Sequence, residues 1–121
     1  MNSKEEIKEQ LNKRPLLLDG AMGTMLQVYG LKSGECSEGW NISHPQVVQK
    51  IHQEYITAGA DVILTNTFGA NRIKLSSYGR EKNILKINEI AVNIANGAIN
   101  KEKSLEKRIF IAGSVGPTGK I

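Results

Sequence analysis

The sequence contains few of the residues that mark the commonest kinds of functional site. Cys36 is the only cysteine and His44 and His52 are the only histidines in 121 residues, so the chain cannot form an internal disulfide or a cluster of thiolate metal ligands. Aromatic residues make up 5% of the chain, and the 16 Lys and Arg residues are interspersed with 12 Asp and Glu residues. Without a basic stripe carrying interleaved aromatics, we expect no nucleic acid partner.

Long apolar runs are absent as well. No segment approaches the length that spans a bilayer, and residues 1–14 have mixed charge with no apolar core of the kind found in signal peptides. We therefore expect no membrane partner and a cytoplasmic location.

Cys36 follows Gly34 in a polar loop without a basic neighbour, which favours a free thiol over a nucleophile or metal ligand.

Three short apolar runs, each ending in a polar tip that contains glycine, are the most informative feature that is present. Continuous apolar runs are typical of strands buried on both faces of a parallel sheet, and ligands of such sheets bind at the carboxyl ends of the strands. The runs and their tips are Leu16–Leu18 before Asp19–Thr24, Val62–Leu64 before Thr65–Ala70, and Ile109–Ala112 before Gly113–Gly119. The sequence therefore predicts one face of one binding site.

The predicted helices separate these runs, so the order of elements is helix, strand, helix, strand, two helices, strand. Such alternation indicates an α/β fold with parallel strands and right-handed crossovers. We expect helices at Ser3 to about Leu11, Pro45–Ala58, Asn71–Tyr78 and Ile84 to about Asn100, and a helical turn at Met25–Tyr29. Ser3 with Glu6 forms a capping box for the first helix. Ser43 with Gln46 forms a capping box for Pro45–Ala58, and Gly59 stands at the end of that helix. Residues 32–39 and 101–104 are expected to be loops, and we interpret His52 as a surface or hydrogen-bonded core residue.

The tips carry groups that suit an α-amino acid. Asp19 can bind an ammonium group, and exposed peptide N–H groups around Gly20 and Gly23 can bind a carboxylate. An ordinary strand-to-helix turn capped by Asp19 explains the same residues equally well. The segment Ser114–Ile121 approaches the phosphate-loop pattern, but Ser114 replaces its first glycine and Ile121 replaces the hydroxyl that holds Mg²⁺, which disfavours nucleotide binding. No set of residues for nucleophilic or metal catalysis is present.

Taken together, three co-linear motifs resemble the homocysteine S-methyltransferase family, and most closely the N-terminal homocysteine-binding domain of cobalamin-dependent methionine synthases. They are Leu18–Thr24, Ala58–Gly69 and Gly113–Thr118, and Asn41, His44–Pro45 and Ile51–Tyr55 resemble the first helix of that family. The resemblance runs from about Leu16 to Gly119.

This resemblance implies an α/β fold in which the chain forms the N-terminal portion, strands 1–3, of a (β/α)₈ TIM barrel. Such a barrel needs about 250 residues, so we expect residues 1–121 to be a truncated homocysteine-binding domain. The implied activity is methylation of the homocysteine thiol to give methionine in the full-length protein. The residues that the resemblance places in the homocysteine pocket are Asp19, Gly20, Ala21, Met22, Gly23, Asn66, Thr67, Phe68, Ser114, Val115 and Gly116.

The family resemblance also implies cofactors that this chain does not hold. Zinc bound by cysteines on later strands holds the homocysteine sulfur, and methylcobalamin, recharged by methyltetrahydrofolate, donates the methyl group. The partners implied are homocysteine, the remainder of the barrel, and folate and cobalamin modules. We expect this chain to supply no catalytic residue and to be inactive alone. We also expect no zinc to bind it, because His44 and His52 are eight residues apart and Cys36 is the only thiol.

Two alternatives remain open from the sequence. A homocysteine methyltransferase of the same family can take its methyl group from betaine or S-methylmethionine. A non-catalytic structural fragment that needs a partner also fits, because the third strand is followed by no helix before Ile121.

Truncation predicts poor behaviour of the isolated chain. Cutting a barrel after its third strand leaves two unpaired strand edges and an apolar inner face in water. Several hundred Å² of such exposure forfeits roughly 10 kcal/mol, about the stability of a whole domain. We expect the 121-residue chain to associate or stay partly molten in size-exclusion chromatography and circular dichroism. A monodisperse monomer with a sharp thermal transition would contradict this expectation.

Overall fold

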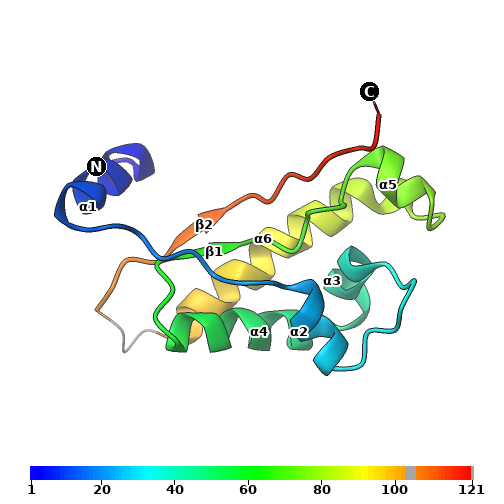
Figure 1. Cartoon of the computed structure of the whole chain (residues 1–121), viewed down its shortest axis with the longest axis horizontal. Helices are drawn as coiled ribbons and strands as arrows, with labels where there is room; N and C mark the ends of the chain where they lie inside the picture. The colour runs from blue at the N-terminus through cyan, green and yellow to red at the C-terminus, as the bar shows by residue number, and fades with distance from the viewer. Residues whose placement is uncertain (103–105, 121) are drawn as a thin grey trace.

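Three parallel segments lie side by side at the centre of the molecule. In the computed structural model, which describes residues 1–102 and 106–120, strand β1 (Val62–Leu64) pairs in parallel with β2 (Phe110–Ala112). Val62 lies opposite Phe110, and on its other side Val62 forms a parallel bridge with Leu18. The parallel, adjacent arrangement of the three apolar runs in sequence order is therefore confirmed (Figure 1).

The first run forms only one bridge because Asp19 ends its pairing. Val62 N–H donates to the Leu17 carbonyl at 3.2 Å, and Asp19 N–H donates to the Val62 carbonyl at 2.9 Å, as in a regular parallel ladder. The next rung would join Leu64 N–H to the Asp19 carbonyl. Instead, Leu64 N–H donates to the Asp19 carboxylate oxygen Oδ2 at 3.1 Å. The side chain thus replaces the main chain, and the tip begins at this residue.

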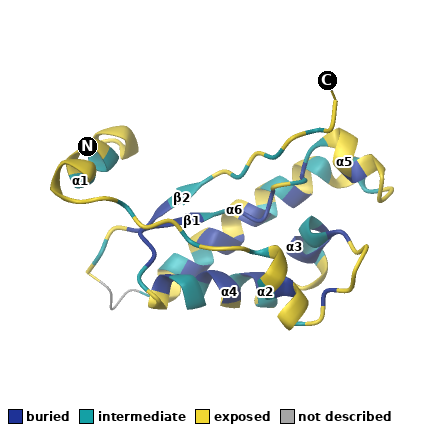
Figure 2. Cartoon of the chain, in the orientation of Figure 1, coloured by how far each residue is buried: buried dark blue, intermediate teal, exposed yellow. Residues whose placement is uncertain are grey.

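Two long helices cover one face of the strands (Figure 2). Helices α4 (Pro45–Thr57) and α6 (Ile84–Lys101) pack together, and Ile63 of β1 is fully buried in a cluster with Ile56 and Ala95. Leu17 and Leu18, in contrast, are 57% and 56% exposed. The remaining elements are α1 (Ser3–Lys13), α2 (Gly23–Val28), η1 (Ser37–Gly39), α3 (Trp40–Ser43), α5 (Arg72–Ser76) and η2 (Glu81–Asn83).

Several sequence-based expectations for the helices are confirmed. Helix α4 ends before Gly59, whose φ of +110° is the left-handed conformation that glycine adopts after a helix. Helix α6 buries the residues that recur at helical spacing, which are Ile87, Ala91, Ile94, Ala95 and Ala98. Outside these helices, Trp40 is buried and its indole N–H donates to Glu35, so it anchors the preceding loop. Of the expected connection at 101–104, residues 103 and 104 lie outside the described residues.

Both predicted capping boxes are wrong in detail. Helix α1 has Asn2 rather than Ser3 at its N-cap, with reciprocal hydrogen bonds to Glu5 rather than Glu6, because this stretch offers the same pattern one residue earlier. Helix α4 has His44 at its N-cap and no side-chain cap. Ser43 is unavailable because it is the last residue of α3, where its hydroxyl donates back to the Gly39 carbonyl.

A buried aspartate joins the amino ends of the three segments. Asp61 is 1% exposed, and its two carboxylate oxygens accept two hydrogen bonds from Arg14, both at 2.8 Å. Lys107 Nζ, just before β2, lies 2.8 Å from Oδ1, and Leu17 N–H donates to Oδ2 at 2.8 Å. The hydrogen bonds from Arg14 are the main reason why the pKa of Asp61 lies well below its usual range, and they outweigh its burial.

Replacing Asp61 should therefore cost stability that depends on its charge. Asp61→Asn leaves Arg14 and Lys107 without their anion, and we expect a loss of about 3 kcal/mol in urea denaturation of the intact protein at pH 7. A carboxyl with a depressed pKa stabilises the fold above its unfolded pKa of about 4, and this contribution fades as the pH falls through the lower folded value. The loss caused by the variant should accordingly shrink below pH 4.

A matched control uses the exposed ion pair of the same region. Glu6 lies 3.0 Å from Arg108 with both side chains partly exposed, so Glu6→Gln should cost less than about 1 kcal/mol. Equal losses from Asp61→Asn and Glu6→Gln would contradict a special role for Asp61.

His52 of α4 does not fit the expected surface or hydrogen-bonded role. It is fully buried, and within residues 1–102 and 106–120 neither ring nitrogen has a hydrogen-bond partner. The sequence could not indicate this, because His52 lies beside the apolar stripe of the helix and packing decides whether it faces inward. Burial lowers the pKa of His52 from 6.5 to about 4, so the ring is neutral at pH 7.

Because His52 is buried as a neutral ring, we expect the protein to lose stability at acidic pH. The pH range of this loss differs from the range in which the charge of Asp61 stops contributing to stability. The unfolded histidine binds a proton near pH 6.5 and the folded one near pH 4, so stability is complete above pH 6.5 and falls between these values. At 1.36 kcal/mol per unit the loss by pH 4 is about 3 kcal/mol. His52→Leu should flatten the stability of the intact protein between pH 6.5 and 4. An unchanged slope in urea denaturation would show that His52 is not its source.

Candidate functional site: a pocket at the strand tips

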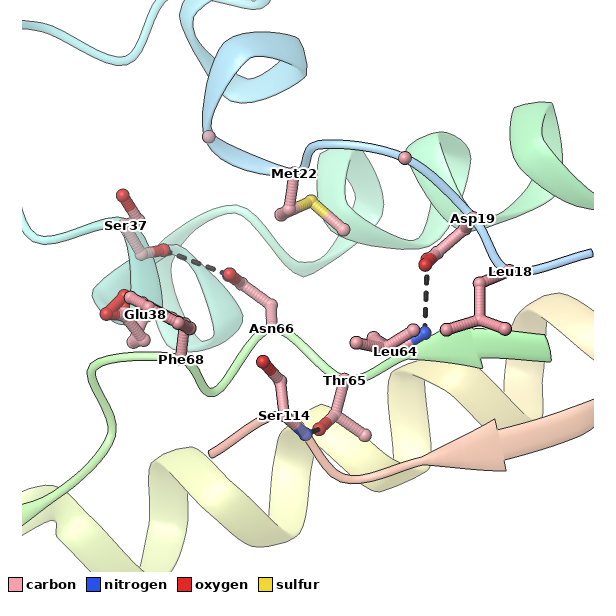
Figure 3. Close-up of a pocket in the computed structure, with 12 residues that line it drawn as sticks. Leu18, Asp19, Met22, Ser37, Glu38, Leu64, Thr65, Asn66, Phe68 and Ser114 are labelled. Carbon is pink, nitrogen blue, oxygen red and sulfur yellow. Dashed lines mark hydrogen bonds between the residues drawn. The ribbon is translucent and has the colours of Figure 1, made fainter. Parts of the chain in front are cut away.

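A pocket of about 390 Å³ lies at the carboxyl ends of the three parallel segments (Figure 3). All three tips contribute to it, together with η1. Its lining residues are Leu18, Asp19, Gly20, Met22, Gly23, Ser37, Glu38, Leu64, Thr65, Asn66, Phe68 and Ser114. The polar side chains among them include two carboxyl groups and no Lys, Arg or His, so the pocket is suited to a cationic group.

Asp19 is the better placed of the two carboxyl groups. One oxygen, Oδ2, accepts the N–H of Leu64, while Oδ1 accepts no hydrogen bond from the described part of the chain. Burial raises the pKa of Asp19, against the opposing effect of that N–H. A half-buried carboxylate with a free oxygen and no cation beside it gains from binding an ammonium ion.

Glu38 is the second carboxyl group, and the sequence analysis did not identify it. It comes from η1, in the segment expected to be a solvated loop, and Gly69 N–H donates to its Oε1 at 3.2 Å. Burial raises the pKa of Glu38. A Cβ at Gly69 would lie 2.5 Å from Oε1, so glycine is needed for this approach. No local sequence signal distinguishes Glu38 from Glu35, because only the fold brings it to the tips.

A buried amide pair fixes the second tip and η1 together. Asn41 of α3 is fully buried, and its Nδ2 donates to the Asn66 carbonyl at 2.9 Å and to the Ile87 carbonyl at 3.3 Å. Asn66 Nδ2 in turn donates to Asn41 Oδ1 and to the Ser37 carbonyl, both at 3.0 Å. Because both Asn66 donors are committed, this side chain can offer a ligand only its oxygen.

The first tip is held by Tyr55 of α4, whose hydroxyl donates to the Ala21 carbonyl at 2.7 Å. Gly20 lines the pocket, and its peptide N–H donates to no acceptor within the described residues. The first tip therefore contributes a carboxylate, on Asp19, and an unpaired peptide N–H, on Gly20, to the residues that line the pocket.

Most of the residues that were predicted from the sequence to bind homocysteine line the pocket, but some do not. Those that line it are Asp19, Gly20, Met22, Gly23, Asn66, Phe68 and Ser114. The Ala21 carbonyl accepts the hydrogen bond from Tyr55, and Thr67 is 8% exposed and lines a separate depression instead. Val115, which is 92% exposed, and Gly116 line the same depression, of about 170 Å³, on the other side of Phe68.

The residues present do not fit a zinc site. Cys36 is buried in an apolar cluster with Ala70 and Leu75, and burial raises the pKa of its thiol. His44 stacks on Trp40 with ring centroids 4.0 Å apart. His52 lies eight residues later in the sequence and is buried. Among the described residues no three His, Cys, Asp or Glu side chains converge as metal ligands. We therefore assign this chain no step that involves a metal.

A membrane-spanning helix is also not found: none in the described part of the chain is both long and apolar enough.

Solved structures to which this chain is similar include those of the homocysteine methyltransferase MmuM from Escherichia coli. Its metallated form superposes with a TM-score of 0.78 at 27% identity over 93% of this chain and 42% of the other. Its oxidized form gives 0.80 at 29% identity, over 90% of this chain and 40% of the other. The chain thus spans about two-fifths of the length of these relatives.

The sequence model of the homocysteine S-methyltransferase family matches residues 16–121, which include all three tips and every residue that lines the pocket. The match covers well over half of the chain, and it agrees with the parallel strands and with the position of the pocket at their carboxyl ends. This chain belongs to the homocysteine S-methyltransferase family.

Proposed function

We propose that this chain forms one wall of the homocysteine site in an enzyme that methylates the homocysteine thiol to give methionine. The observation that carries the proposal is Asp19, a half-buried carboxylate with one free oxygen in a pocket without basic side chains. Family membership supplies the substrate class, and the pocket supplies groups that match its amino acid end.

In this proposal the substrate ammonium binds Asp19 Oδ1, assisted by the side-chain oxygen of Asn66 and the carboxylate of Glu38. The peptide N–H of Gly20 donates to the substrate carboxylate. Phe68 and Met22 supply apolar contacts for the methylene groups. Each polar contact is of the charge-assisted kind, which is stronger than a bond between neutral groups. These residues bind and orient the substrate, and the methyl transfer itself is assigned to groups outside this chain.

We further propose that the chain is the N-terminal part, strands 1–3, of a (β/α)₈ barrel whose remainder closes the pocket. The share of MmuM that it covers, 40 to 42%, supports this. So does the exposure of the apolar side chains Leu17 and Leu18 in the first segment and Phe68 in the second tip, at 57%, 56% and 62%. The remainder of the barrel would pair with the free strand edges and cover these side chains.

The proposed methyl donor is methylcobalamin, recharged by methyltetrahydrofolate, as in cobalamin-dependent methionine synthases. The support is the close resemblance of the three tip motifs to that group of enzymes. Betaine or S-methylmethionine is the alternative donor within the family.

The assay that tests the function uses the intact enzyme, homocysteine and each donor separately, with methionine measured by mass spectrometry. We expect Asp19→Asn to raise the KM for homocysteine roughly 10- to 100-fold, because a hydrogen bond between charged groups contributes about 1.5–3 kcal/mol. Glu89→Gln, which changes an exposed carboxylate on α6, should leave KM unchanged.

The possible outcomes separate the parts of the proposal. No methionine with any donor would overturn the function. A wild-type KM in Asp19→Asn would overturn the role of Asp19 alone. Turnover with betaine or S-methylmethionine but not with methylcobalamin would replace the proposed donor.

A further inference from the structure

Two threonines and one serine form a closed ring of hydrogen bonds between the second and third tips. The hydroxyl oxygens of Thr65 and Thr67 are 2.7 Å apart. The Thr67 hydroxyl lies 2.8 Å from the Ser114 carbonyl, and Ser114 N–H donates to Thr65 Oγ1 at 3.2 Å. The two threonines are 4% and 8% exposed, so water competes little for these groups (Figure 3 shows the contact between Thr65 and Ser114).

The direction of every bond in the ring follows from the chemistry of the groups. A carbonyl can only accept, so Thr67 must give its single hydroxyl proton to Ser114. Thr67 Oγ1 is then left to accept from the Thr65 hydroxyl. Thr65 Oγ1 accepts from Ser114 N–H, which closes the ring. Each donor has one acceptor, and the three bonds run in one direction from the N–H to the carbonyl of Ser114, so they polarise and strengthen one another.

The ring begins where the main-chain ladder of the sheet ends. The last regular bond between the two segments is Thr65 N–H to the Ala112 carbonyl at 3.0 Å. Beyond it, both peptide groups of Ser114 are satisfied by threonine hydroxyls. The chains meet once more where Gly116 N–H donates to the Phe68 carbonyl at 3.1 Å, and a Cβ at Gly116 would lie only 2.4 Å from that oxygen.

We propose that Thr65 and Thr67 are positioning residues. Their ring of hydrogen bonds keeps the second and third segments in a fixed relative position beyond the last ladder bond of the sheet. It thereby holds Ser114 and Phe68 in place where they line the pocket. Both of those residues line the pocket, whereas Thr67 does not. Thr65 also lines the pocket, but each threonine gives its single hydroxyl proton within the ring, so neither donates a hydrogen bond to the ligand and both act through their neighbours. This inference rests on the proposed function, because it assumes that the pocket binds homocysteine.

The test compares Thr67→Val with Thr67→Ser in the intact enzyme. Valine keeps the shape of threonine and removes the hydroxyl, which leaves the Ser114 carbonyl without a donor and the Thr65 hydroxyl proton without an acceptor. We expect Thr67→Val to raise the KM for homocysteine about tenfold, since small displacements of binding groups are costly. Thr67→Ser, which keeps the hydroxyl, should restore KM to within about twofold.

A matched control is available in the third tip. Thr118→Val removes a threonine hydroxyl that, within the described residues, accepts only the N–H of Lys120, at 3.1 Å, and should leave KM within about twofold of wild type. All KM values are measured well below the melting temperature of the least stable variant. A purely structural role for Thr67 would lower the melting temperature without changing KM in the folded enzyme.

Amide hydrogen exchange supplies a readout that does not depend on activity. Ser114 N–H should exchange slowly in the wild type and at least tenfold faster in Thr65→Val, which removes its acceptor. If Thr67→Val does not fold, Thr65→Val takes its place in the KM comparison, with Thr65→Ser as its rescue variant. Fast exchange of Ser114 in the wild type would overturn the ring directly.

The outcomes keep this inference apart from the proposed function. A wild-type enzyme that neither binds nor turns over homocysteine refutes the proposed function, and with it the positioning role. A wild-type enzyme that uses homocysteine, with KM unchanged in Thr67→Val, refutes the positioning role alone. Slow exchange of Ser114 together with a raised KM that serine rescues supports it.

Discussion

The register of the three parallel segments depends on the buried carboxylate of Asp61. Two of its partners are Arg14, just before the first segment, and the N–H of Leu17 within it, and a third, Lys107, stands shortly before the last segment. Asp61 itself stands one residue before β1. A single side chain therefore fixes where each segment enters the sheet. Because side chains alternate between faces, a slip of one residue would turn Ile63 away from α4 and α6 and expose the core.

Buried carboxylates have opposite roles at the two ends of the sheet. At the amino end, Asp61 is surrounded by cations, its charge is compensated, and its pKa is lowered. At the carboxyl end, Asp19 and Glu38 have no cation among the residues that line the pocket, and burial raises the pKa of each. The first arrangement stabilises the fold. The second is unfavourable until a cation binds, which is typical of a ligand site.

The sequence predicted the parts of this arrangement that depend on local pattern. Apolar runs and helical spacing located β1, β2, α4 and α6, and the glycine-containing tips indicated the pocket. What it could not predict depends on contacts between distant segments. Glu38 reaches the pocket only because Asn41 and Asn66 hold η1 against the second tip. Thr67 was expected in the pocket, yet it lines the separate depression beside Phe68, and its hydroxyl donates to a carbonyl 47 residues away. The sequence also cannot show which of two equivalent capping boxes, Asn2 with Glu5 or Ser3 with Glu6, begins helix α1.

The side-chain contacts also explain why each tip needs its own support. A parallel ladder ends abruptly at a strand's carboxyl end, and the peptide groups beyond it must find other partners. Here Tyr55 holds the first tip, Asn41 the second, and Thr65 with Thr67 the third. Each supporting group is a neutral hydroxyl or amide, and none adds a charge to the pocket. The backbone of all three tips is thereby fixed while the free carboxylate oxygen of Asp19 remains the strongest available partner for a bound ammonium group.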